Sequence, residues 1–196
     1  MKNLVIDIES SEKSHATWRY LMQSPSEVTA DIGDTMLHFL TKRLEFDENY
    51  IDSQIKTIFI DGKPVDDLTT AKIPENARIA LGAVAPGVAG MTMCRNSPIS
   101  SMRSGITFHN EQTDQHITEG TVTLLLFNAV MEDKGLQVLQ KGIAIPASKL
   151  ESAITQTAEE IRSASLNDEK ITSEELLEWV RKNPQSQVQL RVNSAS

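Results

Sequence analysis

The feature that most constrains the fold is a strand-forming run that ends in a tight-turn dipeptide. Residues 55–60 are Ile-Lys-Thr-Ile-Phe-Ile, and Asp61-Gly62 follow directly. Asp-Gly favours a two-residue hairpin turn because both positions tolerate positive φ. Residues 63–65 are then expected to return as an edge strand, where Pro64 can sit without breaking a hydrogen-bond ladder. The chain is therefore predicted to contain a sheet with a hairpin at its edge.

The residues on either side of this hairpin supply more strands and one helix. The run at 4–8 and the run at 16–22 are predicted to form the two strands of a first hairpin. After 31–34, the apolar positions Met36, Leu37, Phe39, Leu40 and Leu44 have helical spacing, which predicts a helix over 34–44 with one apolar stripe. The polar turn at 73–76 precedes a further strand at 77–84. These elements predict a mixed sheet with one packed helix.

This order of elements resembles the β-grasp fold of ubiquitin-like proteins over residues 1–90. The likeness is to the small sulfur carriers of thiamine and molybdopterin synthesis, on Phe-Ile-Asp-Gly-Lys-Pro-Val at 59–65 and on the turn and strand at 73–81. A sulfur carrier ends in Gly-Gly with a free carboxylate. Here Gly87-Val88-Ala89-Gly90 has no adjacent glycine pair, and about a hundred residues follow. The resemblance implies the fold and not the sulfur-transfer chemistry.

The second half of the chain is predicted to be a smaller β/α part. A strand covered on both faces is expected at 121–131, and further strands at 136–140 and 142–146. Capping boxes at 148–151 and 172–175 predict two helices, the second ending at Asn183 before Pro184. Residues 187–192 alternate as in a last strand, with a frayed tail as the alternative. The whole is predicted to be α+β: a β-grasp-like domain at 1–84, a Gly/Met/Ser-rich connecting loop at 85–106, and the β/α part at 107–196 packed on the first.

Charge and cysteine content limit the classes of partner and compartment. The chain has 19 basic and 27 acidic side chains, a net charge of −8. General binding to nucleic acid or to an anionic membrane is therefore not expected. Cys94 is the only cysteine, which excludes an intramolecular disulfide and makes a cytoplasmic location the default expectation. The longest uncharged run is 16 residues, between Arg78 and Arg95, so no transmembrane segment is predicted.

The central loop carries the candidate site. No Asp or Glu occurs from 76 to 110, a stretch that has three arginines and lies between flanks of net charge −6 and −5. Flexible methionines in this loop can adapt to a protein partner, and its arginines can bind an acidic or phosphate group. The alternative is a crossover that packs its methionines locally. The candidate contact or anion site comprises Met91, Met93, Arg95, Met102 and Arg103.

Other motifs do not predict a catalytic centre, cofactor or metal. The Gly87-x-x-Gly90 spacing lacks the rest of a nucleotide-binding fingerprint, and Cys94 is expected to be an inert apolar side chain and not a nucleophile. The histidines in 109–116 match no zinc spacing and are expected in an exposed loop. Residues 167–175 imitate half of a calcium-binding loop without its ligands at the first positions.

These observations favour a non-enzymatic protein-binding or assembly module, which acts on a protein partner or forms a homo-oligomer. This expectation follows from the ubiquitin-like resemblance and from the lack of a catalytic constellation. The alternative is a small-molecule or anion-binding protein, or an enzyme, that uses the loop around Arg95 and Arg103.

Overall fold

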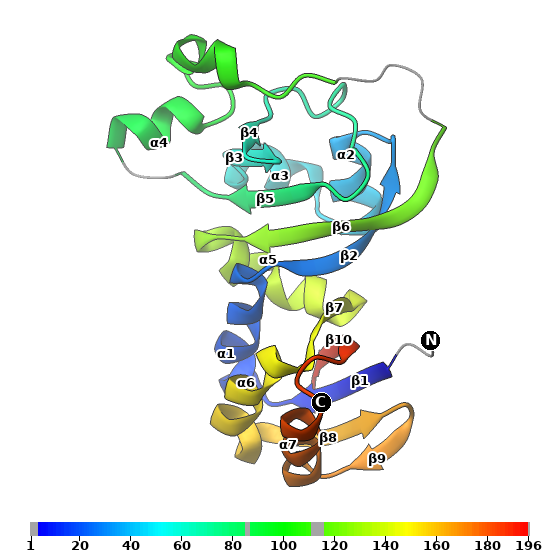
Figure 1. The fold of residues 1–196 in the computed structure, drawn as a ribbon. Coiled ribbons are helices and arrows are strands. Elements are labelled where there is room, and N and C mark those ends of the chain that lie inside the picture. Colours follow the sequence, from blue (N-terminus) through cyan, green and yellow to red (C-terminus); the bar gives the residue numbers. More distant parts are fainter. Residues whose placement is uncertain (1–3, 85–86, 111–115, 196) are drawn as a thin grey trace. The chain divides into compact units, whose positions relative to one another are not determined.

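The computed structural model describes residues 4–84, 87–110 and 116–195 and has an α+β fold (Figure 1). The chain divides into two compact units: unit 1 is Met1–Ser26 with Glu132–Ser196, and unit 2 is Glu27–Met131. These boundaries differ from the division at 84 and 106 expected from the sequence. The reason is that the first strand pairs with the last strand of the chain and not with its sequence neighbours.

Unit 1 is built on the strand order β7-β10-β1-β8-β9. Its strands are β1 (Leu4–Ser10), β7 (Ile143–Pro146), β8 (Ile161–Leu166), β9 (Glu169–Ile171) and β10 (Gln187–Ser194). β1 and β10 run parallel with Leu4 opposite Val188, and β8 runs antiparallel to β1. Alternate residues of β1 and β10 are buried, as period-two strands with one covered face require. The predicted last strand is confirmed, and it lies inside the sheet because β1 and β7 pair with its two edges.

The predicted strand at 16–22 is wrong, because this segment is helical. It forms η1 (Glu12–Ser14), α1 (His15–Arg19) and η2 (Tyr20–Gln23). Trp18 and Met22 are both fully buried, and their spacing of four residues places them on one side of a helix. The high β-propensity of the segment's aromatic residues is overridden by the burial of these two side chains.

The remaining helices of unit 1 correct one prediction and confirm another. They are α5 (Asn128–Lys141), η5 (Ala147–Lys149), α6 (Leu150–Thr157), η6 (Ala158–Glu160) and α7 (Ser173–Lys182). The predicted strand at 136–140 belongs to α5, in which Val138 and Leu139 are buried. α6 begins at Leu150, after the 3-10 turn η5. The capping box before α7 is confirmed, since Thr172 and Glu175 exchange both capping hydrogen bonds.

Unit 2 has the strand order β4-β3-β5-β6-β2. Its strands are β2 (Ser26–Ile32), β3 (Thr57–Ile60), β4 (Lys63–Pro64), β5 (Arg78–Gly82) and β6 (Thr118–Leu126). β5 and β6 run parallel, whereas β3 runs antiparallel to both β4 and β5. Figure 1 shows β2 and β6 pointing in opposite directions. The sheet is mixed, as predicted, but residues 4–8 and 16–22, which the sequence predicts to be part of it, belong to unit 1.

The turn and helix predicted in unit 2 are present. Asp61 and Gly62 have φ of 50° and 77°, the positive values that the Asp-Gly turn between β3 and β4 requires. The helix predicted at 34–44 is observed as α2 (Met36–His38) continuing into the π-helical turn η3 (Phe39–Arg43), and α3 (Glu48–Gln54) follows. Met36, Phe39 and Leu40 are buried from this helix. Among the described residues, no helix is long and apolar enough to cross a membrane.

Candidate functional site

The segment predicted as a connecting loop contains two short helical elements of unit 2. These are α4 (Gly87–Met93) and the 3-10 segment η4 (Ser100–Ile106). The Thr92 hydroxyl donates to the carbonyl oxygen of Val88 at 2.8 Å, and the Cys94 amide donates to that of Met91 at 3.2 Å. The expectation of an irregular loop is therefore corrected for the described part of 85–106: residues 87–93 and 100–106 are ordered into turns of helix.

Arg103 fastens α4 to η4 and uses all of its hydrogen-bond donors within the chain. Its side chain is 2% exposed, and its Nη atoms hold both carboxylate oxygens of Asp66 at 2.6 and 3.0 Å. Nε donates to the carbonyl of Thr92, Nη1 to the hydroxyl of Thr107, and Nη2 to the carbonyl of Cys94. A guanidinium has five N–H donors. All five are used, so Arg103 has none left for an external anion.

Arg95 is also turned inward. Its main-chain amide donates to the carbonyl of Lys56 at 2.7 Å, and its Nη1 donates to that of Ile55 at 3.2 Å. Its Nη2 lies 3.6 Å from the carboxylate of Asp52, and the side chain is 9% exposed. The two arginines are thus held by separate carboxylates, Asp52 and Asp66. Arg103 thus has no donor left for the predicted anion site, whereas the buried Nε of Arg95 has no hydrogen-bond partner in the described part of the chain.

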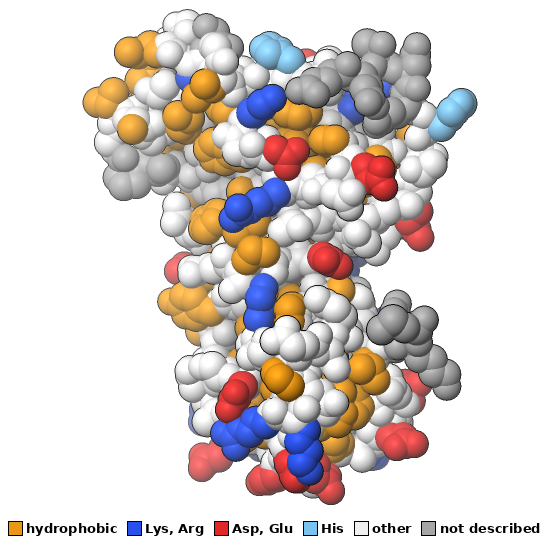
Figure 2. Space-filling model, in the orientation of Figure 1, with side chains coloured by type: hydrophobic (Ala, Val, Ile, Leu, Met, Phe, Trp, Pro, Cys, Tyr) orange, Lys and Arg blue, Asp and Glu red, His pale blue; other side chains and the backbone are white. Residues whose placement is uncertain are grey.

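The apolar side chains of the same elements face outward. Val88 is 65% exposed, Met91 49%, Met102 74% and Ile106 51%. We call these four side chains the α4–η4 surface. With Val84, they make up five of the eight large apolar side chains that are exposed in the described chain. Figure 2 shows the hydrophobic side chains gathered over α4 and η4 at the upper left. The predicted contact residues Met91, on α4, and Met102, on η4, are therefore both exposed.

The other residues singled out around this surface are covered. Met93 is half-buried. Cys94 is 8% exposed, and its thiol donates to the carbonyl oxygen of Gly90 at 3.3 Å. The thiol is therefore buried and has a main-chain acceptor, and the expectation that Cys94 is inert stays a prediction.

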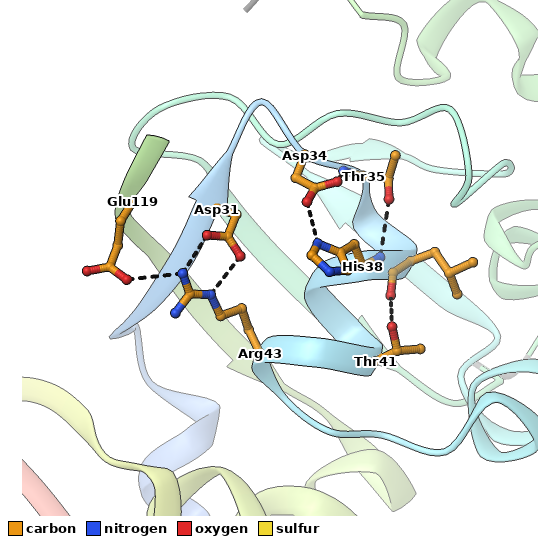
Figure 3. Close-up of polar contacts among 8 residues, drawn as sticks. Asp31, Asp34, Thr35, His38, Thr41, Arg43 and Glu119 are labelled. Carbon is orange, nitrogen blue, oxygen red and sulfur yellow. Dashed lines mark hydrogen bonds and ion pairs between the residues drawn. The ribbon is translucent and has the colours of Figure 1, made fainter. Parts of the chain in front are cut away.

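A second cluster lies where β2 ends and α2 begins (Figure 3). Ligand atoms of Asp31, Asp34 and His38 lie within 4.8 Å of one another. Asp34 accepts from the Thr35 amide at 2.6 Å and contacts Nδ1 of His38. The sequence analysis missed this cluster, although the Asp-x-x-Asp-x-x-x-His spacing was a signal for it.

The side chains of this second cluster that could bind a metal ion already make hydrogen bonds within the protein. Arg43 binds both oxygens of Asp31, and its Nη2 lies 3.0 Å from the carboxylate of Glu119. Hydrogen bonds from Arg43 hold the pKa of Asp31 below its usual range, and the Asp31 carboxylate in turn raises the pKa of Arg43. A metal ion would have to displace this guanidinium. We therefore interpret the cluster as a structural set of ion pairs and hydrogen bonds that links β2, α2 and the end of η3.

The two remaining motifs fit their structural interpretations. His109 and His116 are both exposed, while 111–115 of the same predicted polar loop lie outside the described residues. Asn110 joins this segment to the main chain of residues 70 and 72 through hydrogen bonds of 2.7 and 2.8 Å. The calcium-loop imitation at 167–175 forms the β8–β9 turn and the capping box of α7.

Comparison of the chain with protein-family models, with curated proteins and with solved structures finds no match. The functional argument therefore depends on the geometry of unit 2.

Proposed function

We propose that the chain is a non-enzymatic protein-binding module and that the α4–η4 surface is its contact site. The observation that carries this proposal is the exposure of four apolar side chains on α4 and η4, namely Val88, Met91, Met102 and Ile106. Hydrogen bonds from the buried Arg103 hold these two elements in place. Exposed apolar side chains that gather in one region favour a protein contact. Methionine adds adaptability, because its unbranched side chain can follow the shape of a partner.

The occupant we propose is another protein and not a second copy of this chain. Each copy carries a net charge of −8, and unit 2 alone holds 8 basic and 14 acidic side chains. Two such units brought face to face would repel each other over a Debye length of about 10 Å at 0.1 M salt. The α4–η4 surface itself contains no charged side chain, so its contact energy would come from apolar burial.

The topology of unit 2 supports a β-grasp-like scaffold for this surface. The strands follow the order β2-β6-β5-β3-β4, with the parallel pair β5–β6 at the centre and the α2–η3 helix between β2 and β3. A β-grasp sheet has a central parallel pair and one helix packed on a face. In the arrangement we propose, β6 takes the place of the first strand although it comes last in unit 2. Ubiquitin-like scaffolds commonly act through their surfaces, which is an analogy from fold.

The test is affinity capture with the full chain, followed by binding measurements with each captured protein after purification. The surface variant is Met91→Ser/Met102→Ser. The control is Ile117→Ser, an apolar side chain that is 60% exposed outside the surface. Burying a methionine is worth about 1.5–3 kcal/mol, so the double substitution should weaken a genuine contact by at least about tenfold.

The proposal fails if every captured protein binds the surface variant and the wild-type chain with equal affinity. Light scattering on the same samples tests the other occupant. If the wild-type chain is a dimer and the Met91→Ser/Met102→Ser variant is a monomer, the α4–η4 surface binds a second copy of this chain and not another protein.

A further inference from the structure

An acidic hollow in unit 2 is lined in part by the segment that joins α4 to η4. The hollow has a volume of about 380 Å³, and its lining includes Glu48, Asp52, Asp66, Asp67, Arg95 and Asn96. Arg95 and Asn96 belong to the segment that joins α4 to η4. Asp66 is the carboxylate that Arg103 of η4 holds. The hollow is therefore connected to both elements of the surface by direct bonds and by the chain itself.

The hollow retains negative charge after its internal ion pairs are counted. Its lining contains four carboxylates and one arginine. Arg103 offsets Asp66, and Arg95 is near Asp52, whose side chain is nevertheless 79% exposed. Lys56 places its ammonium on the main-chain carbonyl of Asp52 at 2.6 Å. Glu48 and Asp67 are exposed. The net-negative hollow thus shares residues with the segment that joins α4 to η4 and pairs with Arg103 of η4.

We infer that the partner presents a basic amphipathic segment, with apolar side chains on the α4–η4 surface and Lys or Arg side chains in the hollow. This inference rests on the proposed function and adds the chemistry of the partner. Apolar and basic side chains occupy adjoining faces of an amphipathic helix, and such a helix can be recognised through its apolar anchors. Complementary charge also speeds encounter and rejects acidic partners. The volume of the hollow suits one or two long basic side chains and not a folded domain.

The experiment uses the full chain and three synthetic 18-residue peptides. Each has leucine at helical spacing, and the other positions are all Lys, all Gln or all Glu. The hollow variant is Glu48→Gln/Asp52→Asn/Asp67→Asn, which leaves the Asp66–Arg103 pair intact. The matched control is Glu12→Gln/Glu159→Gln/Glu174→Gln, which removes the same number of exposed charges from unit 1.

We expect the Lys peptide to bind at least about tenfold more tightly than the Gln peptide at 50 mM NaCl, and the difference to shrink at 500 mM because salt screens exposed charge. The hollow variant should weaken the Lys peptide about fivefold or more and leave the Gln peptide unchanged. The control variant should weaken the Lys peptide less than twofold. Binding of both peptides should fall with Met91→Ser/Met102→Ser.

Three outcomes would overturn the inference. Equal binding of the Lys and Gln peptides, with both lost in the methionine variant, refutes the charge preference and leaves the proposed function standing. If the hollow and control variants lose equal affinity for the Lys peptide, the preference for basic peptides comes from the net charge of the whole chain and not from the hollow. If the methionine variant binds all three peptides as the wild type does, the inference and the proposed contact site are both wrong.

Discussion

Replacing the buried Arg103 by leucine should loosen α4 and η4 while the rest of unit 2 stays folded. The substitution places a shorter apolar side chain in the buried position and removes five donors. Asp66 loses both of its guanidinium bonds, and the carbonyl groups of Thr92 and Cys94 lose theirs. Each hydrogen bond that is lost removes its net contribution to stability, which is about 0.5–1.5 kcal/mol.

The size of the effect follows from the exposure of each partner. Breaking a fully buried ion pair costs about 3–5 kcal/mol. Asp66 is 39% exposed, so water can solvate its carboxylate once the pair is broken. We therefore assign about 2 kcal/mol to the loss of the Asp66–Arg103 pair. The two main-chain carbonyls add about 0.5 kcal/mol each. The sum is about 3 kcal/mol, or roughly a hundredfold change in a local opening equilibrium.

Hydrogen exchange measured by mass spectrometry can resolve this opening. Amides of 87–107 should exchange roughly a hundredfold faster in Arg103→Leu, and those of β3 should change much less. Asp66→Asn keeps four of the five acceptors of Arg103, because the amide retains one oxygen, but removes the charge, and it should change exchange in 87–107 by about tenfold. Arg78→Gln, at an exposed position of β5, is the control. Exchange within about threefold of wild type across 87–107 in Arg103→Leu would refute the anchoring role.

Three further predictions concern a glycine and two carboxylates. Gly142→Ala, at φ of 103° after α5, should destabilise unit 1 by about 1–2 kcal/mol, because an L side chain is strained there; urea unfolding followed by tryptophan fluorescence should show no shift if this is wrong. Arg43→Gln should raise the pKa of Asp31, and an unchanged carboxyl NMR titration would contradict this. The lowered pKa of Asp31 stabilises the fold at pH values above the pKa of the unfolded state. This stabilisation is lost as the pH falls through the pKa of the folded state. The pKa of Glu175 is lowered first by a hydrogen bond from the main-chain amide of Thr172 and second by one from its hydroxyl; Thr172→Ala removes only the hydroxyl and should raise this pKa part of the way, and an unmoved midpoint in the same titration would exclude the hydroxyl bond as a cause.

Local patterns predicted the elements whose signals are short-range. The Asp61-Gly62 turn, the helix beginning near Met36 and the Thr172 capping box all depend on residues within a few positions of one another. Each is satisfied by chemistry inside a single turn or helix end. The strand at 187–192 was also predicted correctly, because apolar and polar residues alternate strictly in a strand that has one buried face.

The errors have long-range causes. Residues 16–22 are helical because Trp18 and Met22 are buried together, which depends on elements far along the chain. The pairing of β1 with β10 could not be found from either strand alone. At the candidate site, the exposure of Met91 and Met102 fits the predicted contact surface. The role of Arg103 as an internal anchor depends on Asp66, which lies outside the charge gap where the arginines were noticed.

The pairing of β1 with β10 has a consequence for the order in which the chain acquires its structure during synthesis. Every residue of unit 2 is made by the time residue 131 has been added, so that unit can fold while the ribosome is still producing the rest. β1 is made before unit 2 and then waits for β10, which is made after unit 2 is complete. In that interval its edge is open to non-native pairing, a hazard for any strand that lacks its neighbour. Early completion of unit 2 would shorten the effective loop between β1 and β10 and so reduce the entropy lost when unit 1 closes.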